Sequence, residues 1–479
     1  MANPRIVVVG AGMAGIGVAT KLRELGFNDV TLVEAAGEPG GRVAKSSLGK
    51  SWVDTGAQYI HGASKANPVY CLLKKSGLLD GIPKEEGTVV TYTGTGNKLD
   101  PRFAEHLFEE GEAMLKYRGS NSEKSLGEHL AEQALAFIEN WQGDDEEKRK
   151  VQRVLVSVGK QTLTSIGATD LNKVSLSSWQ YYKNMGEDLD VAGSMFQLVD
   201  ILLEDFPKDQ LLLSKAVCEI DWDGSFSSEN GREYPVRIGT ENGEDILADH
   251  VVVTISLGCL KSQASTLFRP QLPEEKLQVI DKLGFGNLAK IFLEYEEAFW
   301  GSDVEDIRLI SEESFPHLHH NPDQWLKSLE IFTVLKPKKK FGNVLIGWCS
   351  GTVADLIETM SEEELSKAIT ERLRTYTGNA SIPPPKTVLY TRWHNNKLTQ
   401  GAYAFLPVGV SGLVMDILAQ PLSSSKNSSQ DLQVLFAGEA TIKSLYGTVH
   451  GALLSGYREA ERLALHYNRT VTPGVLCDT

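Results

Sequence analysis

The N-terminal segment carries the pattern that most restricts how this chain can fold. Arg5 to Val9 is a short run rich in β-branched residues that leads directly into glycine, as a buried parallel strand does. Gly10, Gly12 and Gly15 follow with the spacing G-x-G-x-x-G. From there, Ala14 to Leu25 places apolar side chains on one face of a predicted helix. This order predicts the first unit of a Rossmann-type, dinucleotide-binding domain.

Each residue type in this pattern has a physical task. Gly10 permits the tight turn, Gly12 lets the backbone approach a pyrophosphate, and Gly15 allows close helix packing. A second predicted strand, Val30 to Val33, ends at Glu34, about 20 residues further on, where a carboxylate binds ribose hydroxyls. We therefore expect the cofactor to be bound by Gly10, Gly12, Ala14, Gly15 and Glu34.

Length and charge narrow the class of protein. At 479 residues the chain exceeds what one hydrophobic core usually supports, so two domains are expected. The net charge of −15 argues against nucleic acid, whose phosphates would be repelled, and suits a cationic small molecule drawn into an acidic cleft. No stretch approaches the roughly 20 apolar residues of a membrane span. The expected partner is a small molecule, with no nucleic acid and no membrane.

The cysteines are few and scattered: Cys71, Cys218, Cys259, Cys349 and Cys477. They show no CxxC or Cys/His spacing typical of zinc, so no metal is expected. Reduced thiols in a reducing compartment are the simplest interpretation. Leu476 to Thr479 is not an SKL-type signal, so we expect a cytoplasmic location, with the peroxisome as the alternative.

Two further glycine-containing segments favour flavin over nicotinamide. Glu38 to Val43 contains Gly40-Gly41-Arg42, where the glycines admit the cofactor and the guanidinium can pair with its phosphates. Asp54 to Gly62 supplies a second close approach of the backbone. These segments resemble the flavin amine oxidase family, which includes monoamine oxidases, polyamine oxidases and flavin histone demethylases. The resemblance implies FAD, bound in these segments by Gly41, Arg42, Gln58 and Tyr59.

The C-terminal part completes this resemblance. Gln433 to Glu439 is typical of a buried strand that ends in an acid, and Tyr446 to Gly456 opens an amphipathic helix. The positive end of such a helix can stabilise the negative charge of reduced flavin. Monoamine oxidases carry a cysteine near this motif that bonds the flavin covalently. No cysteine lies there in this chain, so we expect non-covalent FAD.

The resemblance also assigns individual contacts to the cofactor. It implies that Glu439 meets a ribityl hydroxyl and that the backbone of Thr448 and Val449 meets the pyrimidine edge. The backbone at Val217 would hold the adenine.

Residues 68–207 are predicted to be mostly helical, and strands return from Leu211 onward. The resemblance implies an α/β fold in which a Rossmann-type FAD-binding domain is interleaved with an α+β substrate domain. The expected FAD-binding domain comprises residues 1–75, 208–288 and 424–469, and the expected substrate domain comprises residues 76–207 and 289–423.

Lys290 is the strongest candidate for a catalytic residue. It stands among Leu288, Ala289, Ile291 and Phe292, and an unpaired buried ammonium is costly. By strand alternation alone it could equally point outward into solvent. The resemblance favours the functional interpretation, because Lys290 matches the family's lysine that holds a water near flavin N5.

The resemblance implies a substrate tunnel with aromatic walls. His61 matches a histidine that faces the substrate amine, although a lone histidine is often structural. Aromatic walls suit an aliphatic polyamine and can hold a residual cation. The candidates for catalysis beside Lys290 are His61, Trp393 and Tyr446, and those for substrate binding are His61, Tyr182, Tyr403 and Leu288.

Within the family the resemblance is strongest to polyamine oxidases that act on N1-acetylated substrates. It implies oxidation of a secondary amine. A neutral amine gives hydride to FAD, the imine hydrolyses to a shorter polyamine and an aldehyde, and O2 reoxidises the flavin to give H2O2. The expected substrates are N1-acetylspermine and N1-acetylspermidine, which makes this an enzyme of polyamine catabolism.

Some positions depart from the pattern, and alternatives stay open. Tyr59 replaces the usual tryptophan, and Leu288 stands where acetylpolyamine oxidases carry a polar residue. Spermine oxidase is the first alternative, although Tyr182 and the absence of a long acidic insertion after Trp222 argue against it. A protein demethylase and a non-catalytic flavin-binding protein are the others.

Overall fold

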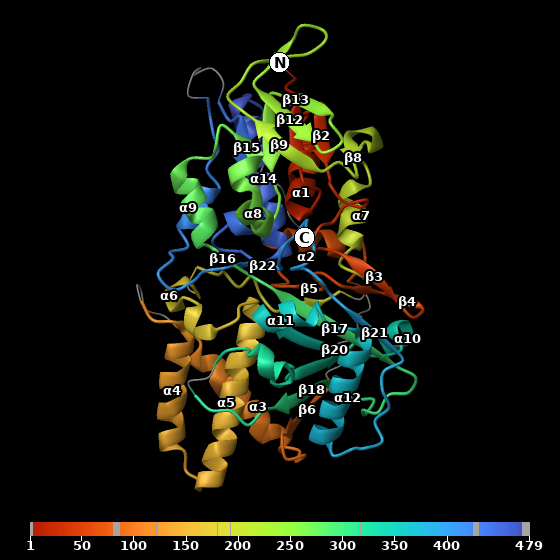
Figure 1. Ribbon diagram of the computed structural model, residues 1–479, viewed down its shortest axis with the longest axis vertical. Coiled ribbons are helices and arrows are strands. Elements are labelled where there is room, and N and C mark those ends of the chain that lie inside the picture. The colour runs from red at the N-terminus through yellow and green to blue at the C-terminus, as the bar shows by residue number, and fades with distance from the viewer. Residues whose placement is uncertain are drawn as a thin grey trace.

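The computed structural model of the 479-residue chain describes residues 3–79, 87–117, 119, 123–179, 181–191, 193–315, 318–424 and 431–471. Figure 1 shows an elongated molecule. The N-terminal strands and the C-terminal helix share its upper half, and a second sheet flanked by helices forms its lower half.

The core of the upper half is a five-stranded sheet assembled from distant parts of the chain. Its order is β23-β14-β1-β2-β8, and every neighbouring pair is parallel. The apolar runs expected at the N-terminus, the middle and the C-terminus therefore pair directly. The strands are β1 (Ile6–Val9), β2 (Val30–Val33), β8 (Leu211–Leu212), β14 (His250–Val253) and β23 (Val434–Phe436).

Two helices from opposite ends of the sequence pack against each other beside this sheet (Figure 1). They are α1 (Met13–Glu24) and α14 (Val449–His466). Their contact is close because Gly456 lacks a side chain: a Cβ there would lie 2.3 Å from the carbonyl oxygen of Ala14. This packing brings the N-termini of both helices to the same region of the molecule, and the cavity described below is lined from both.

A smaller sheet, in the order β13-β12-β9-β15, also lies in the upper half (Figure 1). Next to it, β10 and β11 pair antiparallel as a hairpin. These elements and the adjoining helices are β9 (Val217–Asp221), β10 (Phe226–Ser227), β11 (Glu233–Tyr234), β12 (Val236–Thr240), β13 (Asp245–Ala248), β15 (Phe268–Arg269), α8 (Leu257–Leu267) and α9 (Glu274–Lys282).

The lower half is built on a six-stranded sheet in the order β21-β17-β20-β19-β18-β6. Only the pair β18–β6 is parallel. Its strands are β6 (Thr88–Thr93), β17 (Leu288–Tyr295), β18 (Val304–Ile310), β19 (Ile331–Val334), β20 (Asn343–Ser350) and β21 (Thr387–Tyr390). The helices around it are α3 (Pro101–Met114), α4 (Leu126–Asn140), α5 (Asp145–Ile166), α11 (Gly351–Ile357) and α12 (Glu362–Thr377).

The two faces of β17 meet different surroundings. Ala289, Ile291 and Leu293 join the apolar core formed with α11 and α12. Phe292, on the opposite face, packs with Leu48 and Val53 of the hairpin formed by β3 (Lys45–Leu48) and β4 (Ser51–Asp54). Lys290 lies on the same face of β17 as Phe292, because side chains alternate along a strand. Its side chain therefore points toward the β3–β4 hairpin and away from α11 and α12.

The remaining elements are short. They are β5 (Tyr59–Ile60), β7 (Leu189–Asp190), β16 (Gly284–Gly286), β22 (Tyr403–Phe405), α2 (Pro68–Lys75), α6 (Leu176–Trp179), α7 (Gln197–Leu203), α10 (Lys338–Phe341) and α13 (Val414–Leu418), with 3-10 helices at Leu171–Lys173, Lys208–Gln210, Pro322–Ser328 and Glu439–Thr441.

The structure confirms the α/β class with a parallel sheet. In the described ranges Cys218, Cys259 and Cys349 carry free thiols, but Cys71 is disulfide-bonded, so the expectation of reduced cysteines is wrong there. Residues 476–479, on which the expected compartment depends, lie outside the described residues. Of the part of the chain that is described, no helix combines the length and apolar character that crossing a bilayer requires.

Candidate active site

A cavity of about 1560 Å³ lies where the parallel sheet meets the lower half of the molecule. It exceeds the roughly 300–1,000 Å³ typical of sites for one small ligand. Its walls include the glycine-rich turn after β1, residues 38–44 and 54–59, the start of α14 and the first part of β17. The cavity therefore has room for a dinucleotide together with a second molecule.

The turn between β1 and α1 has the properties expected of a phosphate site. A Cβ on Gly15 would lie 1.8 Å from the carbonyl oxygen of Gly10, so only glycine allows the helix to start this close to the strand. Gly12, by contrast, faces open space, with no protein atom within 4 Å of a Cβ placed there. No side chain caps α1 at Gly12, which leaves its N-terminal amides for a ligand. The residues present thus fit a pyrophosphate.

Glu34 is held rigidly at the end of β2. Its two carboxylate oxygens accept hydrogen bonds from the backbone amides of Ala11, at 2.7 Å, and Ala36, at 2.8 Å. Each oxygen keeps further lone pairs, and the residue lines the cavity. A carboxylate fixed in this way fits the expected contact with ribose hydroxyls.

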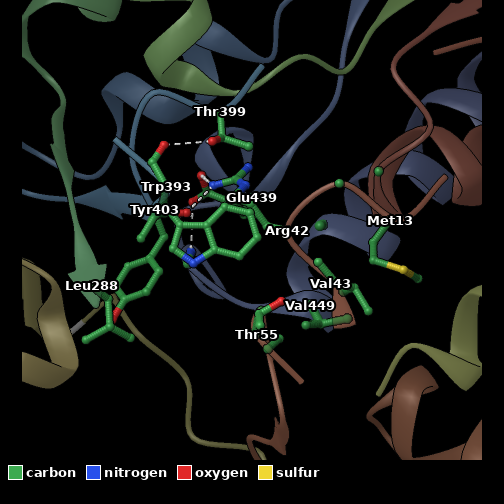
Figure 2. Close-up of a pocket in the computed structure, with 18 of the residues that line it drawn as sticks. Met13, Arg42, Val43, Thr55, Leu288, Trp393, Thr399, Tyr403, Glu439 and Val449 are labelled. Atoms are coloured by element: carbon green, nitrogen blue, oxygen red, sulfur yellow. Dashed lines mark hydrogen bonds and ion pairs between the residues drawn. The ribbon is translucent and has the colours of Figure 1, made fainter. Parts of the chain in front are cut away.

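Arg42 and Glu439 form an ion pair that joins the N-terminal and C-terminal motifs. The Arg42 guanidinium lies 3.0 Å from a carboxylate oxygen of Glu439 and donates to the carbonyl oxygen of Ala402 at 2.6 Å. The other oxygen of Glu439 accepts from the amides of Ala404 and Gly447, at 3.3 and 3.0 Å. Both side chains line the cavity (Figure 2). The pair ties the two predicted flavin motifs together.

The N-terminus of α14 opens into the same cavity. Thr448 caps it, because its hydroxyl accepts a hydrogen bond from the amide of Gly451 at 3.0 Å. Gly447, Thr448 and Val449 all line the cavity wall. The first amides and the positive end of the helix dipole are therefore directed toward a ligand there.

Lys290 projects from β17 into a shell of oxygen atoms and is almost completely buried. Its ammonium donates to the carbonyl oxygens of Asp54, at 2.9 Å, and Gly56, at 2.6 Å, and to Oε1 of Gln58, at 2.5 Å. It also lies 5.1 Å from the ring centre of Trp348. The alternative that Lys290 points outward into solvent is wrong. Strand alternation does turn its side chain away from the apolar core under α11 and α12, but residues 54–58 cover that face of β17.

Burial changes the acid–base behaviour of this lysine. Desolvation lowers the pKa of Lys290 to about 7, and the carboxylates of Asp54 and Asp190 oppose that shift only in part. The side chain therefore exchanges its proton near neutral pH, where an ordinary lysine stays charged. A group of this kind can hold or release a proton beside the cavity.

His61 forms a pair with Asp188 at the cavity wall. Nδ1 of the imidazole lies 2.7 Å from one carboxylate oxygen, and the other oxygen accepts from the amide of Gly62 at 3.2 Å. The hydrogen bond from His61 is the main cause that lowers the pKa of Asp188. A charged carboxylate thus orients the ring, and both side chains line the cavity.

Aromatic side chains supply much of the remaining wall. Tyr403 donates from its hydroxyl to the carbonyl oxygen of Ser165 at 2.8 Å, and the carbonyl of Trp393 accepts from the hydroxyl of Thr399, also at 2.8 Å. Tyr182 and Tyr446 pack edge to face with ring centres 5.9 Å apart. In Figure 2, Trp393, Tyr403 and Leu288 lie toward the left of the view and Val449 toward the right.

The structure brings nearly all the predicted site residues together. Gly15 is the exception: it packs against the turn at Gly10 and does not line the cavity, which agrees with its expected role in close helix packing. The roles of the individual site residues stay predictions. The residues that line this one cavity are Gly10, Gly12, Ala14, Glu34, Gly41, Arg42, Gln58, Tyr59, His61, Tyr182, Val217, Leu288, Lys290, Trp393, Tyr403, Glu439, Tyr446, Thr448 and Val449.

Sequence reasoning missed one wall of the cavity, formed by β18, β19 and β20. Glu305 and Asp306 lie on it, with Lys336 and Trp348 close by. The two consecutive acids beside an apolar strand were the available signal. Their approach to Lys290 depends on long-range strand pairing, which no local pattern reveals.

Comparison with known proteins agrees with this site. The model of the family described as flavin containing amine oxidoreductase matches residues 13–464. The chain is 36% identical to the peroxisomal N(1)-acetyl-spermine/spermidine oxidase of Bos taurus, over 96% of this chain and 94% of that protein. It is 35% identical to the human protein of that name, over 96% and 95%.

A plant protein, polyamine oxidase 1 of Oryza sativa subsp. japonica, is 28% identical over 97% of this chain and 98% of its own length. The family match spans both halves of the molecule and includes Lys290 and the C-terminal motif, and it confirms the expected flavin cofactor. The chain belongs to the family of flavin-containing amine oxidoreductases.

Proposed function

We propose that this protein oxidises a secondary amine of a polyamine with FAD and O2, giving a shorter polyamine, an aldehyde and H2O2. One observation carries the proposal: the cavity that holds the dinucleotide motif also contains the desolvated ammonium of Lys290 and an aromatic, acidic wall. The similarity to two N(1)-acetyl-spermine/spermidine oxidases over almost the whole chain supports the polyamine as substrate.

The protein side chains have distinct tasks in this reaction. Aromatic walls enclose the methylene groups and exclude water, which favours the neutral form of the reacting amine by desolvation. His61, oriented by Asp188, faces the substrate nitrogen and accepts or donates a hydrogen bond. Lys290 holds a proton or a water molecule beside the reacting carbon. Bound FAD supplies the hydride acceptor, and the residues around Gly12, Glu34 and the start of α14 would hold it.

We also propose that one half of the molecule binds FAD and the other binds the substrate. Residues 1–75, 208–288 and 424–469 would form the FAD-binding domain, and residues 76–207 and 289–423 the substrate domain. The parallel sheet supports this arrangement, because it draws its strands from the N-terminal, middle and C-terminal segments. We further propose that FAD is held without a covalent bond.

N1-acetylated spermine or spermidine is the proposed substrate, and spermine is the alternative. Acetylation removes one terminal charge, so that end enters an apolar part of the tunnel without the cost of desolvating an ammonium. Leu288, Trp393 and Tyr403 provide such a part. Leu288 offers no polar group to the acetyl oxygen, which limits the preference expected from this wall.

The test is H2O2 release by the purified flavoprotein with a panel of amines. We expect turnover of N1-acetylspermine, N1-acetylspermidine or spermine, and none of a monoamine or a methyl-lysine peptide. Turnover of the peptide alone would make the protein a demethylase. A flavin-containing protein that releases no peroxide with any amine would be a non-catalytic flavin-binding protein.

A further inference from the structure

The loop between β21 and β22 carries Trp393 into the cavity. Residues 391–402 of this loop form no helix or strand, so its shape depends on hydrogen bonds from outside it as well as on its own turns. Figure 2 shows the indole of Trp393 beside Tyr403 on the cavity wall. The loop residues that line the cavity are Trp393, Asn396, Lys397, Leu398, Thr399 and Ala402. Contacts that fix this loop therefore also fix one wall of the site.

The far end of the loop closes on the backbone of Trp393. The carbonyl oxygen of Trp393 accepts hydrogen bonds from the amide of Gly401, at 2.9 Å, and from the hydroxyl of Thr399, at 2.8 Å. The hydroxyl of Ser256, at the start of α8, donates to the carbonyl oxygen of Thr399 at 2.7 Å. Gly401 has a φ of +137°, and a Cβ there would lie 2.6 Å from the ring of Phe285, so this turn requires glycine.

A buried carboxylate, that of Glu358, holds the residues that directly follow Trp393. Glu358 comes immediately after α11 and is 4% exposed. Its Oε1 accepts from the amide of His394 at 2.9 Å, and its Oε2 accepts from the amide of Asn395 at 2.7 Å. A third donor, Nδ2 of Asn287, lies 2.9 Å from Oε1. Both carboxylate oxygens are therefore used, and two of the three donors belong to the loop.

The influence of Glu358 on the site is indirect. A buried charge is costly unless donors satisfy it, and the three N–H groups do so here. Glu358 does not itself line the cavity, whereas Trp393 does. Its contribution to the site therefore passes through the loop and through Asn287.

Asn287 connects the same carboxylate to the strand that carries Lys290. Asn287 directly precedes β17 and is 4% exposed. Its Nδ2 donates to Oε1 of Glu358 and, at 2.8 Å, to Oδ1 of Asp355. Its Oδ1 accepts from the amide of Leu288 at 2.9 Å. The first residues of β17 and the loop therefore share one anchor.

A second connection to β17 lies two positions before Trp393. The amide of Lys290 donates to the hydroxyl of Thr391 at 3.0 Å, and the amide of Thr391 donates to the carbonyl oxygen of Lys290 at 3.1 Å. Trp393 is thus tied to β17 on both sides, by Thr391 before it and by the contacts of Glu358 after it. The backbone that carries the indole has a fixed position relative to Lys290.

That position matters for transfer of a hydride. The reacting atoms must lie about 3–3.5 Å apart, and a misplacement of about 1 Å can slow a reaction by about 100-fold. In the proposed reaction Trp393 forms one of the walls that hold the substrate. A displaced indole would leave FAD and the amine able to bind, but poorly aligned.

We propose that Glu358 is a positioning residue: it fixes the loop after Trp393 so that the indole aligns the substrate amine for oxidation beside Lys290. This inference rests on the proposed function and adds a residue that acts on the reaction without touching the substrate. A carboxylate is required because the two loop amides each need an acceptor oxygen. Glutamine supplies one acceptor, and its NH2 group would face the other amide.

The test is a double-mutant cycle on the flavin-loaded enzyme. Glu358→Gln, Trp393→Phe and the double variant are each mixed with N1-acetylspermine without O2, and the rate of flavin reduction is measured per bound flavin. We expect Glu358→Gln to slow reduction by about tenfold to 100-fold, with FAD content near that of the wild type. In the Trp393→Phe background the same change should cost less than about threefold, because the indole through which Glu358 acts is already absent.

Asp355→Asn is the matched control. Asp355 lies one turn before Glu358 and accepts from the same Nδ2 of Asn287, and its other described contact is with the imidazole of His394, at 3.6 Å. The variant keeps an acceptor for Asn287 and should change the rate by less than about threefold. If Glu358→Gln does not retain FAD, Glu358→Asp replaces it in the cycle, since aspartate keeps both acceptor oxygens on a shorter side chain.

Losses that multiply in the double variant would show that Glu358 acts independently of Trp393 and would overturn the inference. A loss in the Glu358 variant no larger than that in Asp355→Asn would overturn it as well. Both outcomes leave the proposed function intact. A wild-type flavin that no polyamine reduces would overturn the proposed function and this inference together.

Discussion

The ammonium of Lys290 donates a 2.5 Å hydrogen bond to Oε1 of Gln58, a residue 232 positions away in the sequence. This contact joins the predicted flavin-binding segment to β17, the second strand of the lower sheet. It places a lysine whose pKa is lowered to about 7 on the wall of the cavity. The catalytic account of the site depends on this placement.

Lys290→Met should slow turnover strongly while leaving FAD content near normal. The side chain lines the cavity and donates to Asp54, Gly56 and Gln58, and none of its hydrogen bonds reaches the residues around Gly12 that would hold the cofactor phosphates. We expect kcat to fall by about 100-fold or more, the range for a positioned group that handles protons. Steady-state kinetics and the flavin absorbance of the purified variant measure both quantities.

Lys276→Met is the matched control for this variant. Lys276 is also buried, and desolvation lowers its pKa to about 7 as well, but its ammonium donates to the carbonyls of Ile417, Leu418 and Gln420, away from the cavity. Its loss should lower Tm and leave kcat per bound flavin unchanged. Loss of flavin from Lys290→Met in step with its activity would show that Lys290 is structural.

The value of kcat/KM should rise as the pH is raised from about 6 to above roughly 8. The reacting amine must lose its proton before hydride can leave the adjacent carbon. Lys290, with its pKa lowered to about 7, also becomes neutral in this window, which removes a positive charge that opposes a cationic substrate. Both effects act in the same direction.

The Lys290→Met variant separates the two contributions to this profile. It should retain a rise caused by the substrate amine, but a shallower one than the wild-type enzyme shows. A flat profile of the wild-type enzyme across this range would contradict oxidation of a neutral amine.

The sequence predicts those parts of the arrangement whose contacts are local in the chain, and it does not predict those that depend on distant residues. The strand from Ile6 to Val9 and helix α1 follow from local periodicity and glycine spacing, and the helix bounds differ from the prediction by only one residue. The acid Glu34 also lies at the end of β2 as predicted. Local patterns suffice here because the unit is continuous in sequence.

Non-local contacts explain the rest. Alternation places Lys290 on one face of β17, but only the folded chain shows that residues 54–58 cover that face. The wall with Glu305 and Asp306 is the clearest example: a bulge, visible only from the pairing of β18 with β6, turns both acids into the cavity. The disulfide of Cys71 was missed because its spacing matches no framework of small disulfide-rich domains.

Denaturation by acid or heat should release FAD into solution. Among the residues that the structure describes, free thiols are carried by Cys218, which is exposed, and by Cys259 and Cys349, which are buried. None of them lies near the C-terminal motif, where the resemblance to monoamine oxidases would place a covalent link. Chromatography of the supernatant after precipitation measures the released flavin. Flavin that remains with the precipitated polypeptide would demonstrate a covalent bond.

N1-acetylspermine should have a higher kcat/KM than spermine in one buffer and at one pH. Its acetylated end enters the apolar part of the tunnel near Leu288 and Tyr403 without the desolvation of an ammonium. A clear preference for spermine would place the protein with spermine oxidases and leave the assignments of the flavin site and Lys290 unaffected.

The most direct test of the account is reduction of the bound flavin by substrate in the absence of O2. Purified flavoprotein is mixed rapidly with N1-acetylspermine, and the absorbance of oxidised flavin is followed. We predict complete bleaching at a rate no slower than kcat, restoration of the absorbance with release of H2O2 when O2 is admitted, and strongly slowed bleaching in Lys290→Met. A wild-type spectrum that stays oxidised with every polyamine tested would contradict the account.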